Sequence, residues 1–203
     1  MKYKWLNQRK NNKIIIFFNG WGMDENIVKH LDCEDYDILM FYDYNTLDTD
    51  FDFNLLNSYS EKNLIAWSMG VMIATLFPQI NAKNKIAING TLKPIDIELG
   101  IHPKIYDLTI KGFDKKGREK FINSMFDNKV KINCQREISE QHSELIALKN
   151  YYADELFKYD KIIISDNDKI IPTKSQVTFW VIEPNLKGGH CPFFQFTKWS
   201  ELL

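Results

Sequence analysis

The sequence predicts an α/β protein in which helices cover a mainly parallel central sheet. Short apolar runs rich in β-branched and aromatic residues, such as KIIIFF at Lys13–Phe18, are typical of strands buried on both faces. Polar or helix-like stretches, such as Met69–Phe77, separate these runs, and strands connected through helices run parallel. Ligands of such sheets bind beyond the carboxyl ends of the strands, so the residues that directly follow each run are the candidates for a site.

The strand-like runs lie on both sides of a long segment with a different pattern. Between about residues 100 and 159, charged and apolar residues follow each other at helical spacing, which predicts a helical insertion that would form a lid. A chain of 203 residues fits one domain, so we expect a single domain over residues 1–203 that includes this insertion. The predicted strands are Lys13–Phe18, Tyr36–Tyr42, Asn63–Trp67, Lys85–Asn89, Lys161–Ser165 and, as a final candidate, Val181–Glu183.

The composition argues against several classes of protein. A formal net charge of −1 provides no overall attraction to nucleic acid or to anionic membranes. The three cysteines, Cys33, Cys134 and Cys191, are widely spaced and form no CxxC pair, which disfavours a disulfide framework and a zinc site. The first residues, Met1–Lys13, contain no apolar stretch of signal length, and no uncharged run is long enough to span a bilayer. We therefore expect a cytoplasmic protein with neither a nucleic-acid nor a membrane partner.

The strongest local motif is AWSMG at Ala66–Gly70, which lies between a predicted strand and a helix-forming run. It resembles the nucleophile elbow G-x-S-x-G of the α/β-hydrolase fold, in which a sharp strand-to-helix turn holds the serine hydroxyl above the sheet. Small residues are needed two before and two after the serine, and Ala66 departs from glycine but is still small. A serine that only caps the helix is the alternative, but the complete strand–turn–helix context favours Ser68 as a nucleophile.

A serine hydroxyl is a poor nucleophile unless a base lies within hydrogen-bonding reach, and a third group must orient that base. Of the four histidines, only His190 follows the last predicted strand, in the turn GGHCPF. The α/β-hydrolase fold places its histidine last in the chain, which predicts His190 as the general base. On its own, this histidine would be read as a surface loop residue. The other three histidines are His30, His102 and His142.

The acid of such a triad follows a late strand, and the segment IIISDNDKIIP at Ile162–Pro172 supplies two candidates. The segment resembles the pattern that hydrolases of this fold show here: strand, small residue, two variable residues, acid, apolar pair and proline. That resemblance implies Asp168 as the acid. Asp166 is the alternative, because a small offset in the end of the strand would bring it forward. Both could instead be simple turn formers. The order Ser68, Asp168, His190 is the one that this fold requires.

Two backbone N–H groups must also stabilise the oxyanion of the reaction. Met69, directly after the candidate nucleophile, supplies the first by its position. Trp21 in NGWGMD at Asn19–Asp24 would supply the second, since the flanking glycines permit unusual backbone geometry. A tight turn without function is the alternative there. Asp43, which follows the predicted strand Tyr36–Tyr42, is either a turn residue, which the sequence favours, or a residue with a further role.

Four segments together resemble one family, that of the BioG esterases. They cover almost the whole chain in the correct order: FFNGWGMDE at Phe17–Glu25, AWSMGV at Ala66–Val71, SDNDKIIP at Ser165–Pro172 and GHCPF at Gly189–Phe193. The resemblance implies hydrolysis of pimeloyl-acyl carrier protein methyl ester to the free acid and methanol in biotin synthesis. It implies acyl carrier protein as the partner, and it requires neither a metal nor any other cofactor.

The resemblance further implies an apolar channel for the acyl chain and a basic surface for the acidic carrier protein. The channel walls would come from Trp21 and from four apolar residues of the insertion, although at helical spacing such residues are more often ordinary core. These residues are Phe113, Phe121, Met125 and Phe126. The densest basic cluster would form the docking surface, although charge runs are usually solvated helix faces. It consists of Lys111, Lys115, Lys116, Arg118 and Lys120.

Two other functions are compatible with the fold. A carboxylesterase or an acyl-carrier thioesterase would use the same triad on another substrate, because nothing in the triad distinguishes a methyl ester from a thioester. A non-catalytic binding protein of the same fold commonly lacks at least one triad member. Here all three positions can be filled, which favours an enzyme.

Overall fold

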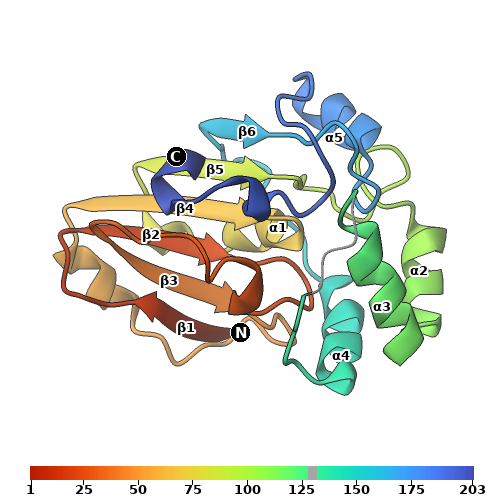
Figure 1. The fold of residues 1–203 in the computed structure, drawn as a ribbon, viewed down its shortest axis with the longest axis horizontal. Helices are drawn as coiled ribbons and strands as arrows, with labels where there is room; N and C mark the ends of the chain where they lie inside the picture. The colour runs from red at the N-terminus through yellow and green to blue at the C-terminus, as the bar shows by residue number, and fades with distance from the viewer. Residues whose placement is uncertain (128–131) are drawn as a thin grey trace.

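The computed structural model describes residues 1–127 and 132–203, and within them the chain forms a six-stranded sheet with helices around it (Figure 1). The strand order is β1-β3-β2-β4-β5-β6, and all neighbours are parallel except β1 and β3. This confirms the predicted mainly parallel sheet. The strands are β1 at Lys2–Asn7, β2 at Lys13–Phe18, β3 at Tyr36–Tyr42, β4 at Glu61–Trp67, β5 at Asn84–Ile88 and β6 at Lys161–Ile163.

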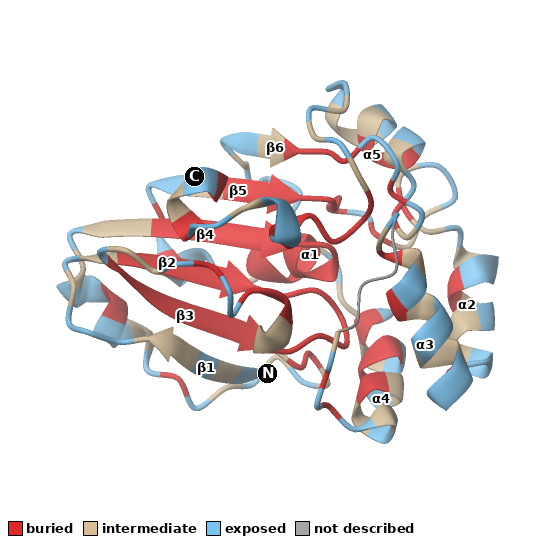
Figure 2. Cartoon of the chain, viewed as in Figure 1, coloured by how far each residue is buried: buried red, intermediate tan, exposed pale blue. Residues whose placement is uncertain are grey.

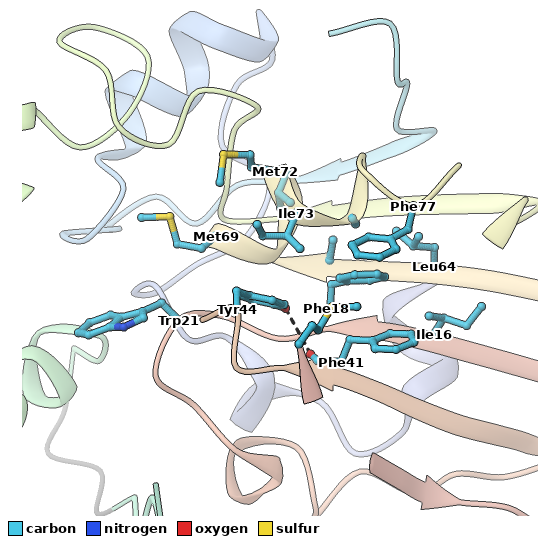
Figure 3. Packing of buried hydrophobic residues seen from close by; sticks show 14 of the residues in the cluster. Ile16, Phe18, Trp21, Phe41, Tyr44, Leu64, Met69, Met72, Ile73 and Phe77 are labelled. Atoms are coloured by element: carbon cyan, nitrogen blue, oxygen red, sulfur yellow. Dashed lines mark hydrogen bonds between the residues drawn. The ribbon is translucent and has the colours of Figure 1, made fainter. Parts of the chain in front are cut away.

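The centre of the sheet is its most buried part, as Figure 2 shows. Strand β2 pairs in parallel with β3 and with β4, and its apolar residues are completely buried. Successive side chains point to opposite faces, so Phe18 belongs to one core cluster and Phe17 to the other. Phe18 packs against Phe41 and Phe77, which Figure 3 shows from close by. The apolar runs thus form strands because both faces of the sheet are covered.

The five α-helices of the described residues follow the strands or belong to the insertion. Helix α1 follows β4 directly, α5 follows β6, and α2, α3 and α4 belong to the expected insertion. Short 3₁₀-helices occupy Glu25–Ile27, Phe53–Ser58, Pro78–Ile80, Phe193–Gln195 and Trp199–Leu202. The α-helices are α1 at Met69–Ala74, α2 at Pro103–Lys111, α3 at Lys115–Ser124, α4 at Ile138–Leu148 and α5 at Thr173–Trp180.

The insertion lies beyond the carboxyl ends of the parallel strands, toward which the arrows of β2 to β5 point in Figure 1. Local signals define its helices. Pro103 begins α2 and Gly112 ends it, while the side chain of Asp114 accepts the Gly117 N–H and caps α3. Residues 128–131, which are part of the expected insertion, lie outside the described residues. Figure 2 shows α2 and α3 mostly exposed or intermediate, whereas α4 has a buried side.

The expected strand at Val181–Glu183 is wrong. The preceding residues form helix α5, and Val181 takes a left-handed conformation (φ 55°) at its C-terminus with 87% of its surface exposed. The apolar run TFWVI therefore belongs to the end of a helix and to the turn after it. Strand β1, which the sequence reasoning missed, alternates charged and apolar residues and pairs with β3 as an antiparallel edge strand.

Within the described ranges, no helix is both apolar enough and long enough to cross a membrane.

Candidate active site

Ser68 stands between β4 and α1 in a strained backbone conformation. Its φ and ψ are 58° and −125°, a region that residues with a side chain rarely adopt. The turn is tight because α1 begins directly against the end of β2: a Cβ atom on Gly70 would lie 2.4 Å from the carbonyl oxygen of Phe18. This close approach explains why a glycine is needed two residues after the serine. The strain holds the Ser68 hydroxyl at the end of the strand.

His190 lies within hydrogen-bonding distance of both Ser68 and Asp168. Its Nε2 is 2.9 Å from Ser68 Oγ, and its Nδ1 is 2.7 Å from Asp168 Oδ2. With Asp168 ionised, Nδ1–H donates to the carboxylate and Nε2 accepts the serine O–H. The His190 carbonyl accepts hydrogen bonds from Trp67 Nε1 and Asn89 Nδ2, both at 2.9 Å. The last residue of β4 and the first residue after β5 thus fix the backbone of this loop.

The carboxylate of Asp168 has a donor for each of its lone-pair directions. Oδ1 accepts the backbone N–H groups of Ile170 and Ile171 at 2.8 and 3.1 Å, while Oδ2 accepts Gln176 Nε2 at 2.8 Å in addition to the His190 hydrogen bond. These donors fix the orientation of the carboxylate toward His190. The sequence reasoning did not identify Gln176, which is completely buried on α5.

Asp166, the alternative acid, lies away from His190. It binds Lys187 Nζ at 2.7 Å and the Gly188 N–H at 2.9 Å, and these interactions, the Lys187 hydrogen bond foremost, lower its pKa. The geometry therefore selects Asp168 over Asp166 as the partner of His190. Asp166 instead anchors the loop that leads to the histidine.

The loop after β2 passes directly beside Ser68. A Cβ atom on Gly20 would lie 2.7 Å from the Trp67 ring and 3.2 Å from the Ser68 Cβ. The two expected oxyanion donors are thus both next to the serine turn. Trp21 directly follows Gly20, which lies against Ser68, and Met69 directly follows Ser68 itself. Both residues line the same cavity as Ser68. In Figure 3 the indole of Trp21 points away from the sheet core, toward the insertion.

A cavity of about 100 Å³ opens over Ser68 and has mainly apolar walls. Its walls are Trp21, Met69, Ile101, Ile105, Tyr106, Thr109, Phe121, Leu145, Lys169 and Ile170. It shares Ile105, Thr109 and Phe121 with a more open hollow of about 420 Å³ between α2 and α3. The cavity over Ser68 and the outer hollow are therefore neighbours, with the shared residues lying between them.

The expected channel residues divide into two groups. Phe121 lines both cavities, and Phe113 lines the outer hollow and packs edge-to-face against Trp21 at 4.9 Å. Met125 lies instead in the core cluster on the other face of the sheet, and Phe126 packs against Phe194. The wall residues of α2 that sequence reasoning missed, Ile105 and Thr109 among them, recur four residues apart, a signal that could have been used.

The expected basic cluster also divides. Lys111, Lys115, Lys116 and Lys120 are exposed on α2 and α3. Arg118 is half-buried, and its guanidinium donates to the backbone carbonyls of Cys134 and Arg136. The Arg118 guanidinium therefore binds the backbone of a neighbouring segment. The sequence alone does not distinguish such an arginine from one that points into solvent.

Asp43 has a left-handed backbone (φ 57°), as suits a turn residue, but its side chain is buried. It forms ion pairs with Lys2 at 2.8 Å and with Arg136 at 3.1 Å. Arg136 in turn binds Glu144 of α4 at 2.6 Å. The sequence reasoning did not foresee this buried charge network.

Comparison with known proteins agrees with the fold and with the motifs. Residues 1–202 match the model of the family described as pimeloyl-ACP methyl esterase BioG. The crystal structure of BioG from Haemophilus influenzae has a TM-score of 0.89 at 32% identity, and the match covers 100% of this chain and 99% of that one. An esterase from Exiguobacterium antarcticum has a TM-score of 0.69 at 14% identity, over 95% of this chain and 89% of that one, which shows a shared fold.

A curated relative from Bacteroides fragilis is named malonyl-acyl carrier protein O-methyltransferase. The identity is 37% over 178 residues, which cover 82% of this chain but only 36% of that protein. The family match across nearly the full length confirms the resemblance stated from the motifs. The chain belongs to the BioG family, and it is an ester hydrolase with the α/β-hydrolase fold.

Proposed function

We propose that the protein hydrolyses the methyl ester of pimeloyl-acyl carrier protein methyl ester in biotin synthesis. The products are methanol and the free carboxylic acid on the carrier. The observation that carries the hydrolytic reaction is the hydrogen-bonded chain from Ser68 through His190 to Asp168 at the floor of an apolar cavity. Membership of the BioG family supports the choice of substrate.

In the proposed reaction, Ser68 Oγ attacks the ester carbonyl while His190 Nε2 takes the hydroxyl proton. Asp168 stabilises the resulting imidazolium through Nδ1–H. The backbone N–H groups of Trp21 and Met69 donate to the oxyanion of the tetrahedral intermediate. His190 then gives its proton to the departing methoxide, which leaves as methanol.

Water completes the reaction. His190 Nε2 removes a proton from a water molecule, and the hydroxide attacks the carbonyl of the acyl-enzyme. The second tetrahedral intermediate collapses, the proton returns to Ser68 Oγ, and the free acid leaves. The same histidine therefore acts as base and as acid in each half of the reaction.

The apolar walls favour a long acyl chain. The ester end would lie at Ser68, and the chain would follow the route between α2 and α3, with Phe121 and Ile105 in contact with its methylenes. The insertion would thus act as the lid. The name of the Bacteroides fragilis relative adds chemical support, because an O-methyltransferase acting on a carrier-bound diacid makes the kind of ester that this reaction removes.

Four exposed lysines of the insertion would receive the acidic carrier protein. They are Lys111, Lys115, Lys116 and Lys120. Replacing Lys116 and Lys120 together by glutamate is expected to raise KM for the carrier-bound ester about tenfold, with a smaller effect at high salt. The control is a free p-nitrophenyl ester, for which KM should not change. An unchanged KM for the carrier-bound ester would move the docking surface elsewhere.

The substrate is tested by relative rates on three esters with matched concentrations of enzyme. We expect the carrier-bound methyl ester to react faster than free methyl pimelate and p-nitrophenyl butyrate. Equal rates would favour a general carboxylesterase, and release of the carrier thiol would favour a thioesterase. The Ser68→Ala variant should lose both turnover and labelling by a fluorophosphonate probe; labelling that persists would place the nucleophile elsewhere.

A further inference from the structure

We propose that Glu144 of helix α4 is a positioning residue that holds the Trp21 N–H in place for the oxyanion. This inference rests on the ester hydrolysis proposed above. It gives the insertion a second role, because α4 would complete the catalytic geometry in addition to covering the cavity.

The two oxygens of Glu144 join two loops that are distant in sequence. Oε2 accepts the Gly22 N–H at 3.2 Å, in the loop after β2. Oε1 accepts the Tyr44 N–H at 2.8 Å, in the loop after β3. The hydroxyl of Tyr44 donates to the carbonyl of Asn19 at 2.7 Å, at the start of the loop after β2. The completely buried Glu144 carboxylate therefore binds the loop of Trp21 directly at Gly22. Through Tyr44 it also reaches Asn19, at the start of the same loop.

The preceding turn of α4 binds the same loop. Gln141 Nε2 donates to the carbonyl of Gly22 at 2.6 Å, and Trp21 Nε1 donates to the carbonyl of Gln141 at 2.8 Å. Gln141 and Glu144 are three residues apart and so lie on one face of the helix. Gly22 has a positive φ of 72°, which only glycine adopts easily, and α4 holds both its N–H and its carbonyl.

The charge of Glu144 supports a positioning role over a purely stabilising one. Its partner Arg136 is nearly as buried, and Asp43 and Lys2 continue the network. Buried ion pairs of this kind are often no more stabilising than well-packed apolar side chains of similar volume. A carboxylate does what an apolar side chain cannot: it accepts hydrogen bonds from two backbone N–H groups and so sets the distance between two loops.

The geometry of an oxyanion hole makes such control necessary. A donor must lie within about 2.7–3.1 Å of the developing oxyanion, and a displacement of about 1 Å can lower the rate about 10²-fold. The Trp21 loop contains Gly20 and Gly22, which have no side chains with which to pack. Hydrogen bonds from α4 therefore add a restraint on the loop backbone to the packing of the Trp21 ring.

The test is Glu144→Gln, which keeps the shape but replaces one acceptor oxygen by an amide nitrogen. Asp37→Asn is the matched control. Asp37 is also a completely buried carboxylate that accepts a backbone N–H, from Arg9 at 2.8 Å, and a hydroxyl, from Tyr59 at 2.8 Å, but it lies at the opposite end of β3. Both variants should have a lower Tm, and only Glu144→Gln should lose activity.

With p-nitrophenyl butyrate, we expect Glu144→Gln to lower kcat about 10²-fold and to change KM less than twofold. Its affinity for phenylboronic acid, which forms a tetrahedral anion on the serine, should fall in parallel. If kcat and boronate affinity match those of Asp37→Asn, the proposal is overturned.

A second variant keeps the test decisive if Glu144→Gln does not fold. Gln141→Met removes the donor to the Gly22 carbonyl and keeps the side-chain length; we expect kcat to fall about tenfold at constant KM, and an unchanged kcat would overturn the proposal. These assays use a small ester and a boronate, so they test the role of Glu144 independently of the substrate. Wild-type protein that does not hydrolyse the carrier-bound methyl ester would contradict the proposed substrate only.

Discussion

Two buried carboxylates differ in how far along the chain their backbone N–H donors lie. Asp168 accepts hydrogen bonds from residues two, three and eight positions later in the chain, and only His190 comes from farther away. Glu144 of α4 accepts backbone N–H groups of Tyr44 and Gly22, which are 100 and 122 residues away. The loop of Asp168 is therefore organised locally, whereas the loop of Trp21 depends on how the insertion packs against the sheet. We therefore expect substitutions far from Asp168 in the chain to leave its loop unchanged. Substitutions in the insertion should displace the loop of Trp21.

The largest expected effect concerns the locally organised acid. Asp168→Asn should lower kcat about 10⁴-fold, because an amide cannot hold the histidine in the tautomer that accepts the serine proton. Asp166→Asn should change kcat less than about threefold, since that side chain binds Lys187 instead. Steady-state rates on a p-nitrophenyl ester measure both. Comparable losses in the two variants would contradict the assignment of the acid.

The next effect separates stability from geometry in the long-range network. Arg136→Met leaves Glu144 without its charge partner and should lower the free energy of unfolding by about 3–5 kcal/mol. The double variant Arg136→Met/Glu144→Gln removes the unpaired buried charge and keeps one acceptor oxygen, so it should recover part of that stability. Its kcat should nevertheless stay low.

Chemical denaturation and rates on the same preparations measure both quantities. A double variant with restored stability and wild-type kcat would show that the carboxylate matters only for folding.

A smaller loss of kcat is expected when Asp168 loses one of its several hydrogen-bond donors. Gln176→Leu removes one hydrogen bond to Asp168 Oδ2 but leaves the two backbone N–H donors and His190. We expect a loss of about 2 kcal/mol in stability and about tenfold in kcat, less than for Glu144→Gln. Equal losses of kcat in the two variants would remove the contrast between local and long-range organisation. The rates and unfolding curves described above provide the measurement.

The smallest effect is a pH dependence of stability. Burial by itself would raise the pKa of Asp43, but hydrogen bonds from Lys2 and Asn45 and the charge of Arg136 outweigh it and hold this pKa below its ordinary value. A lowered pKa means that the stabilisation is present above about pH 4 and is lost as the pH falls through the folded-state pKa. Asp43→Asn should therefore be less stable than wild type at pH 7, and the difference should shrink below about pH 4.

The exposed pair of Asp166 and Lys187 supplies the comparison for this pH effect. The pKa of Asp166 is also lowered, but exposed ion pairs contribute little to stability. Asp166→Asn should leave the acid limb of the unfolding profile close to that of wild type. A pH-independent difference between wild type and Asp43→Asn would contradict the assigned ionisation of Asp43.

Sequence reasoning succeeded for features that a few neighbouring residues encode. The strands β2, β3 and β4 follow from buried apolar runs, and the turn at Ser68 follows from a strand, a small residue, a serine and a glycine in fixed order. It failed at Val181–Glu183, where an apolar run belongs to the end of a helix and an exposed turn. It also expected Met125 in the wall of the acyl channel, whereas that side chain lies in the core cluster that contains Phe17.

By itself, the sequence determined the central parallel strands, the tight serine turn and the loop that presents Asp168. Backbone strain, apolar periodicity and short-range hydrogen bonds act between residues that are close in the chain. Only the tertiary structure decided that Arg118 turns inward, that Asp43 shares a buried arginine, and that Glu144 meets the N–H of Gly22. Such contacts join segments separated by up to 122 residues, and their geometry exists only once the insertion packs against the rest of the chain.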